Sequence, residues 1–146
     1  DTPAWQVDGP FYHNWGPTCR ESVDRSARAE WVLSPPEDGV YTIKAWWTKA
    51  PTQSTWSNAA VYEVVARGKV IAAATVDQSK GGDAWVSIAT VRLARRDNSV
   101  LRLRGRGSGT LYADAVLVES EARYNDGAAL REVTLAPFDA IVLGKR

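Results

Sequence analysis

The stretch KAWWTKAPTQSTWSNAAVYEV, residues 44–64, contains two adjacent tryptophans, Trp46 and Trp47. Successive side chains of a β-strand point to opposite faces, so the two indoles cannot both be buried on one side of a sheet. In the run VYTIKAWW, which ends at this pair, Trp47 falls on the same face as Tyr41 and Ile43. We therefore predict that Trp47 lies in the core and that Trp46 points outward.

The same two-residue period recurs on both sides of this stretch. Upstream, Ala27, Ala29, Trp31 and Leu33 alternate with mostly polar neighbours, and the turn PPEDG that follows, residues 35–39, predicts a hairpin with the strand ending at Trp47. The run AVYEVVARGKVIAAATVDQ predicts two strands joined at residues 67–69, and further strands are predicted in AWVSIATVRL, VLRLRGRG and TLYADAVLVES. No stretch shows a sustained helical stripe. The sequence therefore predicts an all-β fold, an antiparallel β-sandwich or jelly roll.

Length and composition limit the organisation and the partners. We assign residues 1–120 of the 146 to one β-sandwich domain; residues 121–146 are predicted to be a linker with one or two strands, which complete the sandwich or belong to a neighbouring domain. The formal net charge of +1 argues against nucleic acid and a membrane surface as partners. Because the sequence starts at Asp1 and contains no Met, we expect a piece of a longer protein.

Residues suited to catalysis are scarce in this sequence. His13 is the only histidine, no nucleophile-elbow pattern occurs, and a single cysteine leaves no internal disulfide. We predict neither a catalytic residue nor a cofactor. A structural calcium ion centred on Asp8, Asp24 and Asp114 is kept as a minor alternative, although no known calcium-binding spacing supports it.

The aromatic residues carry more information, because the chain has 7 Trp and 5 Tyr but only 2 Phe. Rings with a polar handle suit half-exposed surfaces, where they can stack on the flat faces of sugars. Alternation assigns three tryptophans to the core: Trp31, Trp47 and Trp85. Three others are predicted at the surface, where ligand contact and edge packing are equal alternatives: Trp15, Trp46 and Trp56. Tyr12 and His13, in the loop FYHNWG, are further candidates for stacking on a sugar.

Four motifs in a fixed order between Ala27 and Glu119 carry a resemblance to a known family. They are AEWVLSPPEDGVYTIKAWW, SNAAVYEV, VDQSKGGDAWVSIATV and YADAVLV. The sequence resembles the domain found in golvesin and near the C-terminus of some xanthan lyases. This resemblance implies a galactose-binding-like β-sandwich and a carbohydrate-binding role; residues 1–26 match the family only loosely. Residues 135–145, LAPFDAIVLGK, are similar instead to the last strand of β-sandwich domains that close many glycoside hydrolases and polysaccharide lyases.

Comparison with the family motifs allows the candidate ligand-binding residues to be ranked. Trp46 and Trp56 are additions of this chain, which makes them the better candidates for ligand preference. Asn58 and Gln78 match family positions, and for both of them ligand contact and a framework role are equal alternatives. For Asp114, a framework role is favoured, because buried polar residues that tie loops together look the same in a sequence.

The run VLRLRGRG predicts a row of arginines on one face of a strand. Leu101 and Leu103 are expected to point to the core, with Arg102, Arg104 and Arg106 on the opposite face. Guanidinium groups in such a row can bind the carboxylates of an acidic polysaccharide. The favoured alternative is a solvated face that keeps an edge strand from pairing with a neighbour.

These features predict a non-catalytic carbohydrate-binding module of a secreted bacterial enzyme that degrades polysaccharides. Its expected partners are a polysaccharide or oligosaccharide and a covalently linked catalytic domain. The main alternative is a spacer domain that packs on a catalytic domain without binding sugar. A weaker alternative is a small hydrolase or lyase.

Overall fold

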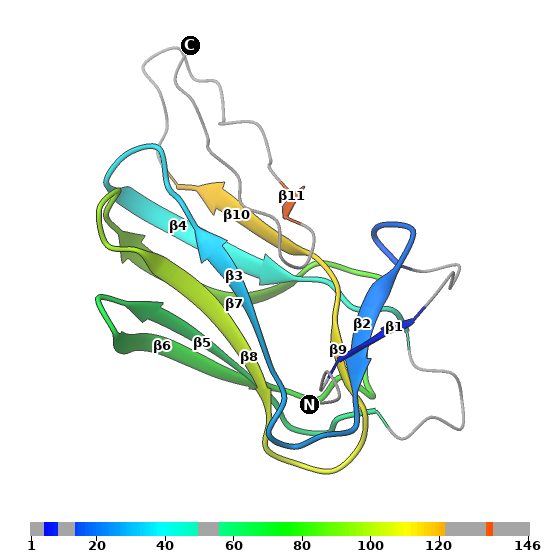
Figure 1. Cartoon of the computed structure of the whole chain (residues 1–146). Helices are drawn as coiled ribbons and strands as arrows, with labels where there is room; N and C mark the ends of the chain where they lie inside the picture. Colours follow the sequence, from blue (N-terminus) through cyan, green and yellow to red (C-terminus); the bar gives the residue numbers. More distant parts are fainter. Residues whose placement is uncertain (1–4, 9–13, 50–55, 122–133, 136–146) are drawn as a thin grey trace.

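The computed structural model describes residues 5–8, 14–49, 56–121 and 134–135, and within these ranges all regular secondary structure is β-strand (Figure 1). The strands are β1 (Gln6–Asp8), β2 (Cys19–Ser22), β3 (Arg28–Leu33), β4 (Gly39–Ala45), β5 (Ala60–Ala66), β6 (Lys69–Val76), β7 (Val86–Leu93), β8 (Ser99–Gly105), β9 (Leu111–Ala113), β10 (Val116–Ser120) and β11 (Thr134–Leu135). The predicted all-β class is confirmed.

The strands form three antiparallel sheets, and the two larger ones make the layers of a sandwich. One layer has the order β3-β8-β5-β6 and the other the order β11-β10-β4-β7, while the small sheet β1-β2-β9 lies at one end (Figure 1). Trp31 and Leu101 from the first layer share one apolar cluster with Tyr41 and Ile43 from the second. This core fixes the two layers and so positions the loops at their ends.

The pattern of burial around the adjacent tryptophans confirms the predicted strand register. Tyr41 and Ile43 of β4 are fully buried, and Trp47 continues their face just beyond the end of the strand with only 1% of its surface exposed. Trp46 is partly exposed on the opposite side. One hairpin is also confirmed: Arg67 (φ 50°) and Gly68 (φ 72°) join β5 to β6, with the two positive φ values that a type I′ turn requires.

Two predicted strand relationships are wrong. The turn PPEDG does not close a hairpin, because β3 pairs with β8 whereas β4 pairs with β7 and β10, so residues 34–38 carry the chain from one layer to the other. The arginine-bearing strand β8 is not an edge strand, since it lies between β3 and β5. Turn residues mark where the chain reverses, whereas distant contacts decide which strand it pairs with.

The run TLYADAVLVES, predicted as a single strand, is two strands joined at a corner. β9 ends at Ala113 and pairs with β2 in the small sheet, whereas β10 begins at Val116 and pairs with β4 in the sandwich. Asp114 and Ala115 form the corner between them. Strands that change sheets in this way turn sharply, and the corner brings the buried Asp114 next to the loop that carries Trp15.

At the other end of the described chain, β11 pairs with β10 through Leu135 opposite Val116 and Thr134 opposite Leu117. Most of LAPFDAIVLGK, in which a terminal strand was predicted, lies outside the described residues. No helix in the described ranges has the length and apolar character needed to cross a bilayer.

Candidate functional site

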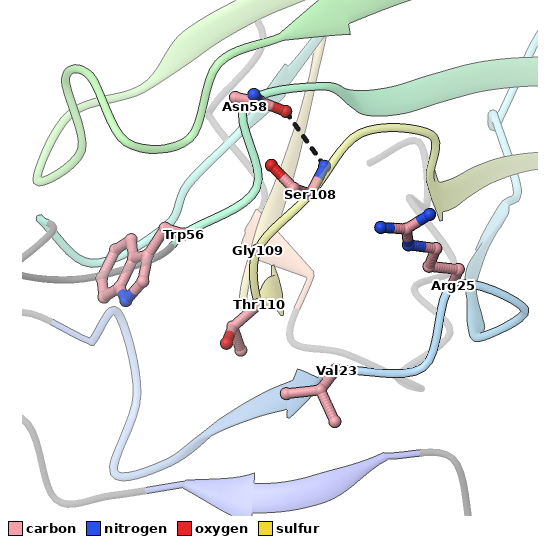
Figure 2. Close-up of a pocket in the computed structure, with 7 residues that line it drawn as sticks. All are labelled: Val23, Arg25, Trp56, Asn58, Ser108, Gly109 and Thr110. Atoms are coloured by element: carbon pink, nitrogen blue, oxygen red, sulfur yellow. Dashed lines mark hydrogen bonds between the residues drawn. The ribbon is translucent and has the colours of Figure 1, made fainter.

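A pocket of about 450 Å³ opens where three connections meet at one end of the sandwich. Residues 23–25 come from the connection between β2 and β3, residues 56–58 precede β5, and residues 108–110 join β8 to β9 (Figure 2). All three segments are anchored at strand ends. The lining therefore combines residues that are far apart in the sequence.

Backbone hydrogen bonds hold two of these segments together. The Ser57 N–H donates to the Thr110 carbonyl at 2.8 Å, and the Asn58 N–H donates to the Ser108 carbonyl at 3.2 Å. The Asn58 side chain completes the link, because its Oδ1 accepts the Ser108 N–H at 3.2 Å (Figure 2). A Cβ at Gly107 would lie 2.1 Å from that Oδ1, so glycine is required for the close approach. The wall of the pocket is therefore preformed.

Trp56 forms the aromatic part of the lining, but it is more buried than predicted. Its exposed fraction is 8%, because its ring packs on Tyr112 of β9 with centroids 4.1 Å apart and an angle of 31° between the planes. The expectation of a surface indole is wrong in this respect. What remains exposed belongs to the pocket, where the indole lies close to Thr110 (Figure 2).

Polar groups of three kinds face the same pocket. Asn58 supplies an exposed amide, Ser108 and Thr110 supply hydroxyls, and Arg25 supplies a guanidinium. Among the described residues, neither a carboxylate nor an imidazole lines it. An indole beside amide, hydroxyl and guanidinium groups suits binding of a polyhydroxylated ring. Arg25 was not predicted from the sequence.

A second group of aromatic side chains lies next to Asp114, at the corner between β9 and β10. The rings of Trp15, Trp46 and Trp85 form a cluster in which centroid distances are 4.7 to 5.5 Å and the planes are inclined by 56° to 66°. Trp15 has an exposed fraction of 46%, so its prediction as a surface residue is confirmed. Trp85 is only partly buried, so its assignment to the core is wrong. We name Trp15, Trp46 and Trp85 the indole cluster.

The corner residues hold the indole cluster in place. The Asp114 carboxylate accepts the Trp15 N–H at 3.0 Å, and the Ala115 carbonyl accepts the Trp46 N–H at 2.9 Å. Burial raises the pKa of Asp114 to about 6, although the hydrogen bond from Trp15 partly offsets this effect. Asp114 has an exposed fraction of 2% and serves as framework, as the sequence favoured.

The raised pKa of Asp114 predicts a stability that depends on pH. The folded protein binds this proton more tightly than the unfolded chain, so the contribution of Asp114 to stability falls as pH rises from its ordinary pKa of 3.8 through about 6. Asp114→Asn keeps an acceptor for Trp15 but does not titrate in this range. We expect its free energy of unfolding, measured relative to that of the wild type, to increase as pH rises from 5 to 8. Urea unfolding of both proteins at each pH measures the difference; a constant difference would contradict the prediction.

Gln78 is part of the framework and does not reach the surface. Its exposed fraction is 0%; its amide nitrogen donates to the Tyr112 carbonyl at 2.8 Å and to the Tyr62 hydroxyl at 3.3 Å, and its Oε1 accepts the Tyr112 N–H at 3.0 Å. Of the two alternatives left open for Gln78, the structure therefore supports the framework role and not contact with sugar. An inward amide and a ligand-binding amide occupy similar sequence contexts, and only the partners distinguish them.

Arg102 and Arg104 lie on the outer face of β8 as predicted, but β8 ends at Gly105, before Arg106, and both arginines are paired with carboxylates. Arg102 Nε lies 2.7 Å from Glu30 Oε1, and Arg104 Nη2 lies 2.6 Å from Glu63 Oε1. The hydrogen bond from Arg104 lowers the pKa of Glu63 against the effect of desolvation, and the same pair raises the pKa of Arg104. Neither Arg102 nor Arg104 lines the pocket, and Arg106 is exposed without lining it.

Some candidates lie outside the residues that the structure describes. Tyr12 and His13 are among them, and so is the side chain of Asp8. Asp24 Oδ1 accepts the N–H and the hydroxyl of Ser26, both at 2.7 Å, which lowers its pKa. In the described part of the chain, no three histidine, cysteine or carboxylate side chains come together as a metal site, so nothing here supports the calcium alternative.

Comparisons with known proteins match this architecture. The profile of the Golvesin C-terminal domain family matches residues 2–120, so the similarity begins well before Ala27, where the sequence motifs placed its start. Among solved structures, a xanthan lyase from Paenibacillus is similar with a TM-score of 0.65 and 19% identity; the match covers 77% of this chain and 11% of that chain. A likeness at this identity shows the fold alone. No curated protein matches the chain.

Proposed function

Since the chain belongs to the Golvesin C-terminal domain family, we propose that it is a non-catalytic carbohydrate-binding module of a secreted bacterial enzyme that degrades polysaccharides. The similar structure is a part of a xanthan lyase, a fold likeness that is consistent with an ancillary module linked to a catalytic domain. The partner would be a polysaccharide or an oligosaccharide segment of it.

The observation that carries this proposal is the pocket beside Trp56. Its volume of about 450 Å³ falls within the range of small-ligand sites, about 300–1,000 Å³. The indole offers a flat apolar surface close to Thr110, and Asn58 offers a further hydrogen-bonding group elsewhere in the lining (Figure 2). Because the two segments are already joined by hydrogen bonds, little entropy would be lost when a sugar binds.

The indole cluster supports one alternative function, a spacer domain that packs on a catalytic domain. Trp15 is 46% exposed and lies against Trp46 and Trp85. The inclined rings give an uneven apolar surface rather than a flat platform for a sugar ring. Such a surface suits contact with another protein surface. In the carbohydrate-binding proposal, Trp15 and Trp46 would be secondary contacts to a longer glycan.

Native gel electrophoresis in the presence of soluble polysaccharides tests the proposal. We expect the wild-type chain to be retarded by at least one member of a panel of neutral and acidic polysaccharides. We expect Thr110→Gln, which places a longer uncharged side chain in the pocket, to weaken that retardation about tenfold, a loss of about 1.4 kcal/mol of binding free energy. Thermal unfolding should be nearly unchanged, because the side chain of Thr110 is only partly buried and borders the open pocket.

Thr75→Gln is the matched control, since Thr75 is exposed on β6 and does not line the pocket. Its retardation should equal that of the wild type. Equal retardation of both variants would move the site away from the pocket, toward the indole cluster. A wild-type chain that migrates alike with and without every polysaccharide would favour the spacer function.

A further inference from the structure

Arg25 gives the pocket a positive charge at the side away from Trp56. In Figure 2, Trp56 and Arg25 lie on either side of the loop at residues 108–110, and the guanidinium of Arg25 is directed toward that loop. We propose that the pocket binds a glycan that carries a carboxylate, with Arg25 holding the carboxylate while a sugar ring contacts the indole of Trp56. This inference rests on the proposed carbohydrate-binding function and specifies the chemical class of its ligand.

The backbone that carries Arg25 is held in a hydrogen-bonded turn. The Asp24 N–H donates to the Ser22 hydroxyl at 3.1 Å, the Ala27 N–H donates to the Asp24 carbonyl at 3.0 Å, and the Asp24 carboxylate accepts two hydrogen bonds from Ser26. This arrangement directs the neighbouring acid, Asp24, toward Ser26 rather than toward Arg25. The guanidinium is thus presented on an ordered turn.

Arg25 differs from the arginines of β8 in having no carboxylate partner among the described residues. Arg102 and Arg104 are paired with Glu30 and Glu63, whereas among the described residues no carboxylate pairs with Arg25. The described lining contains no carboxylate either. An anionic group entering the pocket would therefore find an available guanidinium without displacing an internal ion pair.

The chemistry of the guanidinium favours a carboxylate over a hydroxyl as the bound group. Arg offers two parallel N–H donors that match the two oxygens of a carboxylate, and such charge-assisted hydrogen bonds are about twice as strong as neutral ones. Asn58, Ser108 and Thr110 then remain for the hydroxyl groups of the glycan. A uronic acid residue within a polysaccharide has both features, a carboxylate and hydroxyl groups on one ring.

The test compares acidic polysaccharides with their carboxyl-reduced counterparts, which differ only in having a primary alcohol in place of each carboxylate. We use the complete 146-residue chain, with polygalacturonate, alginate and hyaluronan as probes, each beside its reduced form, in affinity electrophoresis at low salt. We expect at least one acidic probe to bind about ten- to a hundredfold more tightly than its reduced form, the size of effect typical of a hydrogen bond to a charged group. The preference should shrink at high salt.

Three variants locate the charge that is responsible. Arg25→Gln should weaken binding of the acidic polymer to the level of its reduced form and so abolish the preference, whereas Arg25→Lys, which keeps the charge but lacks the fork, should retain part of the preference. Arg92→Gln removes an exposed arginine from β7, which contributes nothing to the pocket, and should behave as wild type. Circular dichroism of the variants checks that the fold is kept.

The outcomes distinguish this inference from the function on which it rests. Equal binding of acidic and reduced polymers, or a preference that survives Arg25→Gln, overturns the assignment of a carboxylate to Arg25; if Thr110→Gln still weakens binding, the carbohydrate-binding function stands. If none of the six polymers is bound and the neutral panel is not bound either, the proposed function fails, and the ligand class assigned to the pocket fails with it.

Discussion

Replacement of Trp47 by alanine is expected to lower the free energy of unfolding by about 3–5 kcal/mol, the usual cost of truncating a large buried aromatic side chain. Trp47 is 1% exposed and belongs to the apolar cluster that joins the two layers of the sandwich. Its indole N–H has no acceptor within the part of the chain that the structure describes, so the expected loss comes from packing and the cavity left behind. Chemical denaturation followed by far-UV circular dichroism measures it.

Trp46→Ala is the internal control for this experiment. Trp46 is partly exposed and packs at 5.3 Å and 5.5 Å, between ring centroids, from Trp15 and Trp85, so its truncation should cost clearly less than that of Trp47. It should nevertheless change the near-ultraviolet circular dichroism, because it removes one of three coupled indoles. A larger loss of stability for Trp46→Ala than for Trp47→Ala would mean that the strand register is wrong by one residue.

Strand positions could be predicted from the sequence, because alternation is a local property of the chain. Residues around Trp31 and Trp47 alternate between core and surface, and the burial in β3 and β4 follows that pattern. Apart from the hairpin of β5 and β6, whose turn is local, pairing could not be predicted, because it depends on contacts between distant residues. The turn PPEDG has the composition of a hairpin turn, yet it leads from one layer to the other.

In the candidate site, too, features that depend on the local sequence could be predicted, whereas contacts between residues far apart in the sequence could not. Trp56 was predicted as a candidate because it lies in a polar loop and Asn58 because it matches a family position, and both line the pocket. The sequence did not reveal that the ring of Trp56 is covered on one side by Tyr112, since that contact depends on the corner at Asp114. Arg25 was missed: Asp-Arg-Ser is a turn signal, but nothing local shows that this turn borders a pocket.

The role of the arginines on β8 was the least reliable of the predictions made from the sequence. The row on β8 suggested arginines available to an acidic ligand or arginines protecting a sheet edge. In the structure β8 is an inner strand, and the neighbouring strands β3 and β5 supply Glu30 and Glu63 as partners. Cross-strand neighbours of opposite charge are brought together by the register, which the sequence of β8 alone does not contain. The arginine that borders the pocket lies in a loop instead.

Gln78→Leu should lower the free energy of unfolding by about 3–4 kcal/mol. The side chain of Gln78 satisfies both the N–H and the carbonyl of Tyr112 and also contacts the Tyr62 hydroxyl, inside a fully buried site. Leucine has a similar size but no polar atom, so the hydrogen bonds of Gln78 would be lost inside a buried site, where a lost hydrogen bond of a buried group costs about 1–3 kcal/mol. Urea denaturation of the two proteins gives the difference.

Two further measurements separate this framework role from direct contact with a ligand. Tyr62→Phe removes only the longest of the three contacts, 3.3 Å, and should therefore cost less than Gln78→Leu. Because Gln78 fixes the backbone of Tyr112, and the ring of Tyr112 supports Trp56, glycan binding by Gln78→Leu should weaken together with stability. Gln78 is thus a positioning residue for the pocket. Loss of glycan binding with an unchanged free energy of unfolding would show instead that the amide reaches the ligand, and the buried position of Gln78 in the fold would then be wrong.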